Sequence, residues 1–287
     1  PVGGGIVAGL KIVAVAIVAQ AVWGMARSLT PDRTRATIAL VAVLIVVLAA
    51  GASGQVLAIA AGGVAGLLLC RTDLAAGAAP LAFPVSRRAG ALSLSLFFLL
   101  LVGLPLAASA VPGLALFDAF YRAGSLVFGG GHVVLPLLEA EVVGHGWAGH
   151  DAFLAGYGAA QAVPGPLFTF AAYLGAIASA GPGGIAGAAV ALAGIFLPGF
   201  LLLVGAIPFW DRFRRMAGVQ GLMRGANAAV VGILGAALYD PVFTTAVTDP
   251  RRFALALACF VLLTAWKAPP WIVVLVGAAG GVLIGAG

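Results

Sequence analysis

Charged residues are scarce in this chain. Asp, Glu, Lys and Arg make up 8% of its 287 residues, whereas a soluble domain carries about 25%. Hydrophobic residues make up 63%, and the mean hydropathy is +1.16. This composition excludes an ordinary soluble domain and indicates a multi-pass membrane protein. The apolar runs last roughly 15–25 residues, which predicts helical spans, because barrel strands alternate over only about 10 residues.

Cysteine and histidine are also rare, with two and three residues. Cys70 and Cys259 both lie in apolar runs, so neither a disulfide framework nor a cysteine metal cluster is expected. His145, His150 and Asp151 flank a Gly-rich stretch without an established ligand spacing. That pattern favours a surface loop over a metal site. We therefore expect no metal and no cofactor.

Motifs of enzymes and of nucleic-acid binders are absent as well. The sequence has no Gly-x-Ser-x-Gly, His-Glu-x-x-His or P-loop pattern, so we do not expect an enzyme. The formal net charge is +6, but the basic residues sit in short loops between apolar runs. Membrane topology explains that placement better than a nucleic-acid partner does. An alternative is a membrane enzyme acting on an anionic lipid or isoprenoid phosphate, although the Asp-x-x-Asp spacing of a metal-binding acidic cluster is missing.

The apolar runs predict where the helices lie. A Pro-, Ala- and Arg-rich stretch near residues 71–88 separates a first group of runs from the rest. Pairs of short runs near each end predict tight hairpins or partial insertions. The helices expected outside the central region cover residues 6–25, 36–50, 56–69, 91–111, 184–210, 219–239, 253–266 and 271–284.

The two ends of the chain repeat one order of elements. Gly-Leu at 9–10 and at 221–222 opens a helix, a charged loop follows, and a short hairpin ends in Ala-Ala-Gly-Gly-Val at 60–64 and at 278–282. Placing the arginine-rich loops in the cytoplasm makes the two long helices run in opposite directions. We therefore expect an inverted repeat, a layout of secondary transporters.

This repeat divides the chain into three parts. Residues 1–70 are expected to be the remnant of a first transporter half, 71–90 a linker, and 91–287 a second half. The second half carries a region of motifs, residues 113–180, ahead of its repeat helix, and the first copy has no equivalent. The repeat arithmetic predicts that about 100 residues are missing before residue 1.

Two helical patterns in residues 113–180 are each broken near the middle. Gly129, Gly130 and Gly131 interrupt the first, and Pro164-Gly165-Pro166 interrupts the second. Backbone groups left unpaired within a bilayer must face protein, water or a ligand. A helix N-terminus carries about half a positive charge and free N–H donors, so two converging N-termini would bind an oxyanion. The alternative is that these residues only kink packed helices.

Polar residues adjoin the first break. Arg122 follows Asp118 by four residues, so the two are expected to share a helical face. Arg122 would bind the anion and Asp118 would be its resting counter-charge; a structural ion pair is an equal alternative. His132 opens the second half-helix, where it would donate to an oxyanion or simply pack as a neutral ring.

Further polar residues lie beyond each break. Glu139 follows His132 by two turns on the same face and is the expected proton carrier, because intramembrane carboxyls are costly and functional. Glu141 is off that face and nearer the loop, so we expect it to be solvated. Gln161 would supply amide donors before the second break, and Thr169 a hydroxyl after it.

These motifs resemble the chromate ion transporter (CHR) family. The resemblance rests on Phe-Gly-Gly-Gly-His-Val-Val-Leu-Pro-Leu-Leu-Glu at 128–139, Gly-Trp at 146–147 and Gln-Ala-Val-Pro-Gly-Pro at 161–166. It covers the whole chain, with residues 113–287 as a complete second half. It implies a multi-pass exporter of chromate in the bacterial inner membrane, driven by the proton gradient and associated with chromate resistance.

The implied partners are chromate or the similar oxyanion sulfate, protons and the lipid bilayer, with a homodimer considered beside a single copy. Glu139 and Asp118 are the expected proton-coupling residues. Long members of the family carry a related Phe-Gly-Gly and Pro-Gly-Pro set in their first half, and this chain lacks it. A chain with half a site, or a non-transporting remnant, is therefore the remaining alternative.

Overall fold

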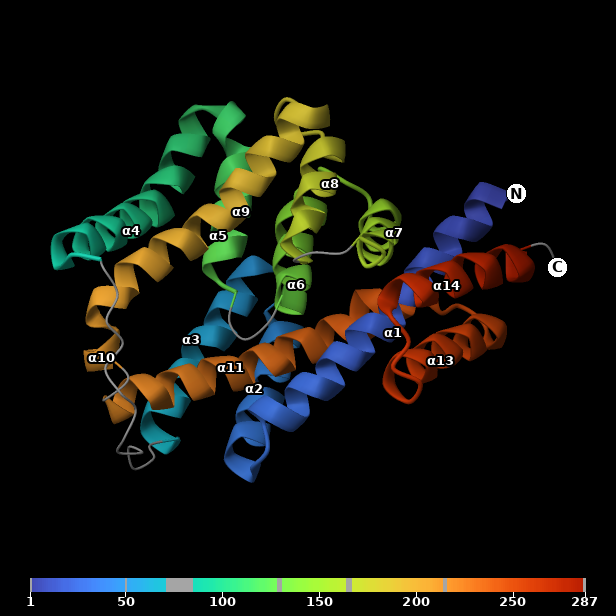
Figure 1. Cartoon of the computed structure of the whole chain (residues 1–287), viewed down its shortest axis with the longest axis horizontal. Coiled ribbons are helices and arrows are strands. Elements are labelled where there is room, and N and C mark those ends of the chain that lie inside the picture. Colours follow the sequence, from blue (N-terminus) through green and yellow to red (C-terminus); the bar gives the residue numbers. More distant parts are fainter. Residues whose placement is uncertain are drawn as a thin grey trace.

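The chain is all-helical in the computed structural model (Figure 1), which describes residues 2–49, 51–70, 85–127, 131–163, 167–213 and 216–285. The α-helices are α1 (Val2–Leu29), α2 (Arg33–Leu48), α3 (Ala52–Leu69), α4 (Arg87–Ala110), α5 (Ala115–Ser125), α6 (Val134–Leu138), α7 (His150–Ala160), α8 (Phe170–Ile177), α9 (Gly184–Ala206), α10 (Trp210–Phe213), α11 (Ala217–Ala237), α12 (Thr244–Ala246), α13 (Pro250–Thr264) and α14 (Pro270–Gly285). Short 3-10 turns are η1 (Pro112–Leu114), η2 (Gly131–Val133), η4 (Leu167–Thr169) and η5 (Ile207–Phe209), and π-helical turns are η3 (Glu139–Val143) and η6 (Leu238–Phe243). No strand occurs among these residues.

Several of these helices are long and apolar enough to cross a bilayer. Within the described residues there are five, namely Val2–Leu29, Ala52–Leu69, Arg87–Ala110, Gly184–Phe209 and Ala217–Ala246. A helix of about 20 apolar residues spans the hydrocarbon core and satisfies every backbone group internally. The predicted class, an all-α integral membrane protein, is confirmed.

One predicted loop is smaller than expected. The polar segment after residue 239 was expected to be a loop; the backbone does leave the helical conformation at Asp240, but helical turns resume after it and run to Ala246. Asp249 then caps α13, because its side chain accepts the backbone N–H groups of Arg251 and Arg252. These two arginines therefore lie in the first turn of a helix rather than in a loop.

Each terminal hairpin packs against the long helix of the other end of the chain. The hairpin of α2 and α3 lies on α11, whereas α13 and α14 lie on α1. The helices α1 and α11 contact each other and run in opposite directions (Figure 1). Opposite directions are what an inverted repeat requires; the two-fold superposition of the repeats stays a prediction, as do the domain boundaries.

Glycines bring these helices into backbone contact. A Cβ added to Gly225 of α11 would clash with the carbonyl oxygen of Gly62 in α3. At the other end, a Cβ on Gly9 of α1 would clash with the carbonyl oxygen of Gly277 in α14. Such close approach is how membrane helices gain packing contacts where the hydrophobic effect between helices is absent.

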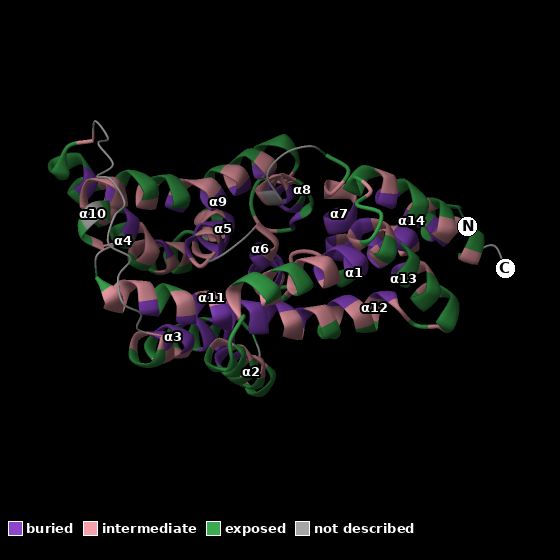
Figure 2. Ribbon diagram, turned by 60° about the horizontal axis from the view of Figure 1, so that its bottom comes forward, coloured by how far each residue is buried: buried purple, intermediate pink, exposed green. Residues whose placement is uncertain are grey.

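The interrupted helices lie in the centre of the structure. Figure 2 shows buried residues concentrated where α1, α5, α6, α7 and α11 meet. By contrast, α4 buries only Gly90, Phe97 and Leu104 and exposes a row of large apolar side chains. A helix exposing such a row faces lipid, so α4 lies at the rim and the interrupted helices are covered by protein.

Candidate functional site

Both helices of the central region are interrupted where the sequence predicts. The first ends with α5 at Ser125 and resumes at η2, and the second ends with α7 at Ala160 and resumes at η4. Residues 126–127 and 161–163 are non-helical. Gly131 is the first residue of η2. The other predicted residues of the two breaks, Gly129, Gly130, Pro164, Gly165 and Pro166, lie outside the described residues.

The two helix restarts adjoin each other. Residues of η2 and η4 approach within 8 Å between Cα atoms, η2 also contacts α11, and η4 contacts α9. Turns from two interrupted helices therefore meet inside the protein. The N–H groups at the start of each resumed helix lack intrahelical acceptors, so this meeting point is suited to an anion.

His132 joins the two interrupted helices. Its Nδ1 lies 2.8 Å from the hydroxyl oxygen of Tyr157 in α7. Tyr157 is fully buried, and a buried hydroxyl needs such a partner. The second ring nitrogen of His132 is not used by this contact. Tyr157 was not predicted as a site residue, because a tyrosine in an apolar helix gives no distinguishing signal.

Gln161 ends α7 directly before the second break. Its Nε2 is buried and has no hydrogen-bond partner among the described residues. Leaving a buried donor unpaired costs about 1–3 kcal/mol, so this amide is suited to a bound group. Thr169 is the last residue of η4, on the far side of the same break.

A buried ion-pair network lies in the first interrupted helix. Nη2 of Arg122 is 3.0 Å from Oδ2 of Asp118 and 2.9 Å from Oε2 of Glu141. Both carboxylate side chains are 6% exposed, and that of Arg122 is 33% exposed. Asp118 Oδ1 and Arg122 Nε have no partner within the described part of the chain. The predicted pairing of Asp118 with Arg122 is confirmed.

The predicted solvation of Glu141 is wrong. This residue lies in the π-helical turn η3. Glu141 lies off the face of Glu139, as its spacing predicts, but that second face packs against Arg122 of α5 rather than facing water. His145 follows, with its Nδ1 2.6 Å from the carbonyl oxygen of Glu141 and its ring stacked on Trp147.

Glu139 lies two turns beyond His132 and contacts the same helix. Its Oε1 is 3.3 Å from Nδ1 of His150, at the start of α7. Glu139 lies seven residues after His132, whereas its partner His150 lies seven residues before Tyr157, the partner of His132. The two segments therefore run antiparallel. Glu139 and His132 therefore share a face toward α7, as predicted.

The loop predicted for His150 and Asp151 is also corrected. Both residues start α7, and Asp151 Oδ1 is 2.7 Å from Nζ of Lys11 in α1. Their side chains are still half-exposed or more, at 50% and 70%. Lys11 is buried and was overlooked, although one cation inside an apolar run is a recognised signal of a functional or paired group. Among the described residues, no group of three His, Cys, Asp or Glu is placed to hold a metal.

Interrupted helices that meet inside an all-helical membrane protein, with ionisable residues buried beside them, are an arrangement that secondary transporters use. The chain belongs to the chromate transporter family, whose family model matches residues 114–282. The resemblance inferred from the motifs is thereby confirmed.

Named relatives agree with this family. The chain is 34% identical over 176 residues to the chromate transport protein of Pseudomonas aeruginosa, and 31% identical over 169 residues to that of Cupriavidus metallidurans. Each match covers 58% of this chain and 40% of the relative. The uncharacterized transporter YwrA of Bacillus subtilis is 37% identical over 109 residues, which is 37% of this chain and 59% of the relative. No solved structure matches.

Proposed function

We propose that this chain is a secondary transporter that exports chromate across the bacterial inner membrane, coupled to the proton gradient. Two observations carry the proposal: η2 and η4 meet, and the buried amide of Gln161, directly before the second break, has no hydrogen-bond partner in the described part of the chain. Unpaired N–H groups at such a point favour a tetrahedral oxyanion. Support for chromate over other oxyanions comes from the two relatives whose names state chromate transport.

Two groups beside the restarts would hold the anion. Gln161 would donate through Nε2, and His132 through the ring nitrogen that Tyr157 does not engage. Thr169, at the end of η4, would add a hydroxyl from beyond the second break. Sulfate has the same shape and charge as chromate, so it would compete for these donors.

Arg122 would join the anion site only after losing a carboxylate partner. One guanidinium is shared by Asp118 and Glu141, so the three residues carry an excess of negative charge when all are ionised. Protonation of either carboxylate would release N–H donors of Arg122 to the oxyanion. Proton uptake would then favour anion binding, which is the linkage that a proton-coupled transporter needs.

Glu139 would be the second proton-coupling group. Its carboxylate is mostly buried, but it contacts His150, whose half-exposed ring connects the carboxylate to solvent. An ionised carboxyl inside the protein is expensive unless paired. Protons would therefore reach Glu139 from the exposed side through His150.

The test is flux of labelled chromate and labelled sulfate in vesicles that contain the purified chain, with and without a pH gradient. Chromate flux stimulated by the gradient and competed by sulfate is expected. Absence of flux would overturn the proposal and favour a non-transporting remnant.

Variants identify the site within the same assay. Gln161→Ala and His132→Ala should each weaken chromate binding roughly tenfold or more, because a hydrogen bond to a charged group contributes about 1.5–3 kcal/mol. Gln20→Ala is the matched control, since Gln20 lies in α1 and its side chain hydrogen-bonds only the carbonyl oxygen of Leu263 among the described residues. Equal binding by all three variants would place the anion elsewhere.

A further inference from the structure

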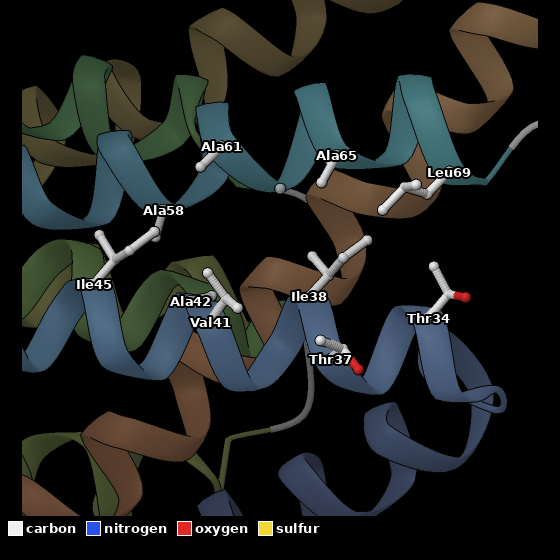
Figure 3. Close-up of a pocket in the computed structure, with 11 residues that line it drawn as sticks. Thr34, Thr37, Ile38, Val41, Ala42, Ile45, Ala58, Ala61, Ala65 and Leu69 are labelled. Atoms are coloured by element: carbon white, nitrogen blue, oxygen red, sulfur yellow. The ribbon is translucent and has the colours of Figure 1, made fainter.

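An apolar groove runs between α2 and α3 on the outside of the structure. Its cavity volume is about 340 Å³, within the range of about 300–1,000 Å³ that small-molecule sites occupy. Figure 3 shows Ile38 and Ile45 of α2 facing Ala58 and Ala65 of α3 across it. The small side chains of α3 leave the room that the groove occupies.

The length of the groove matches one leaflet of a membrane. Its lining on α2 begins at Thr34 and ends at Ile45. Eleven residues of helix rise about 16 Å, and one leaflet contributes about half of the ~30 Å hydrocarbon core. An extended acyl chain of ordinary length would lie along it. A transmembrane helix is about 10 Å wide and would fill on the order of 1,200 Å³ over this length, several times the volume present.

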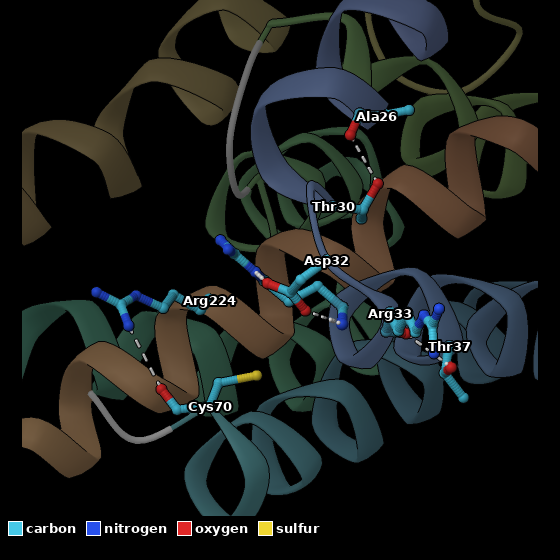
Figure 4. A network of polar contacts seen from close by, with 8 residues as sticks. Ala26, Thr30, Asp32, Arg33, Thr37, Cys70 and Arg224 are labelled. Atoms are coloured by element: carbon cyan, nitrogen blue, oxygen red, sulfur yellow. Dashed lines mark hydrogen bonds and ion pairs between the residues drawn. The ribbon is translucent and has the colours of Figure 1, made fainter.

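Charged side chains lie near the end of the groove where α2 begins and α3 ends, and Figure 4 shows Asp32, Arg33 and Arg224 there. Arg35 is paired with Asp32, its Nε lying 2.6 Å from Oδ2, so its charge is compensated. Arg33 begins α2 with an exposed side chain that has no ion-pair partner in the described part of the chain. Arg224 of α11 reaches the carbonyl oxygen of Cys70, at the end of α3, over 3.5 Å. Arg33 therefore gives the mouth of the groove beside Thr34 a positive charge.

We propose that this groove binds an anionic phospholipid, with one acyl chain between α2 and α3 and the phosphate at Arg33. The distribution of arginines places this end of the hairpin in the cytoplasmic leaflet, which is the leaflet rich in anionic lipids. The positive charge at the mouth of the groove selects an anionic headgroup, and the apolar groove holds the acyl chain. The site is separate from the interrupted helices, so it does not depend on the transport proposal.

The experiment is native mass spectrometry of the purified full chain with added phosphatidylglycerol or phosphatidylcholine. The chain is expected to retain phosphatidylglycerol in preference to phosphatidylcholine. Arg33→Gln should reduce phosphatidylglycerol retention about fivefold, the effect of one basic residue near an anionic surface. Ala61→Phe, which fills the groove, should reduce retention of both lipids.

Matched controls are Arg87→Gln, an exposed arginine of α4, and Ala186→Phe, an exposed position of α9; both should retain lipid as the unmodified chain does. If Ala61→Phe does not fold, Val41→Asn at the exposed rim of the groove takes its place. Equal retention of the two lipids, or unchanged retention after filling the groove, overturns the proposal. A dimer that Ala61→Phe abolishes would also overturn it, by assigning the groove to a second copy.

Discussion

Replacement of Arg122 by Gln is expected to destabilise the protein, because it leaves two buried carboxylates without their shared counter-charge. Removing one member of a buried ion pair costs about 3–5 kcal/mol. The Arg122 side chain is 33% exposed, so water screens part of the electrostatic cost. We therefore expect the free energy of unfolding to fall by about 2 kcal/mol. For a chain of this size that corresponds to a fall in Tm of about 4–8 °C. The measurement is thermal unfolding in detergent, followed by tryptophan fluorescence.

A second substitution separates the structural role of Arg122 from a role in binding. The pair Arg122→Gln with Glu141→Gln removes one of the two carboxylates, so much of the lost Tm should return. Chromate binding should stay weak in the double variant, because the guanidinium donors are still absent. Acidification should also reduce the difference in Tm between Arg122→Gln and the unmodified protein, since a protonated carboxyl needs no counter-charge. Arg87→Gln, at an exposed position of α4, is the control and should leave Tm unchanged.

Two results would refute this reasoning. An Arg122→Gln variant that unfolds at the temperature of the unmodified protein would mean that the network contributes no net stability. Recovery of chromate binding in the double variant would mean that Arg122 only neutralises carboxylates and never contacts the anion.

Three further predictions concern other parts of the chain. Glu139→Gln, which mimics the protonated carboxyl, should keep chromate binding but lose stimulation of flux by a pH gradient; full stimulation would make Glu139 structural. Gly225→Val should lower stability by about 1–3 kcal/mol by forcing α11 away from α3, whereas Gly235→Ala, with open space around it, should not, as thermal unfolding would show. The backbone N–H and side chain of Arg35 lower the pKa of Asp32 below 3.8, so the stabilisation it gives α2 is present at neutral pH and is lost as the pH falls through that lowered pKa. Because Asn also caps helices, Asp32→Asn removes only the charge, and its Tm difference from the unmodified protein should shrink below pH 3.8; an unchanged difference would mean that the ionised carboxylate adds no stability.

Hydropathy predicts the spans well, because a helix in a bilayer must satisfy its own backbone. The first span was predicted over residues 6–25 and extends over Val2–Leu29. The remaining errors lie at helix ends, where single side chains decide the boundary. Asp32 and Asp249 each accept backbone N–H groups and so start α2 and α13 several residues before the apolar runs begin.

The candidate site was harder to predict than the spans, because its pairs join segments far apart in the chain. The Asp118–Arg122 pair follows from spacing within one helix, and it was found. Glu141 was wrongly expected to be solvated, because its spacing shows which face it occupies but does not show that Arg122 of α5 covers that face. The pairing of Lys11 with Asp151 spans 140 positions, so only the three-dimensional packing reveals it.

The exchange of hairpins between the two ends constrains the order in which this protein can assemble. The α2–α3 hairpin packs on α11, where Gly62 contacts Gly225, a residue much later in the sequence. During synthesis that hairpin enters the bilayer long before its partner helix exists, so its glycine-lined face meets lipid in the interim. The α13–α14 hairpin, by contrast, emerges when α1 is already in place and can dock at once. Because such long-range contacts form late, the α2–α3 hairpin has no partner helix until nearly the whole chain has been synthesised. A ribosome-bound intermediate stalled before α11 should therefore expose this hairpin to chaperones and proteases.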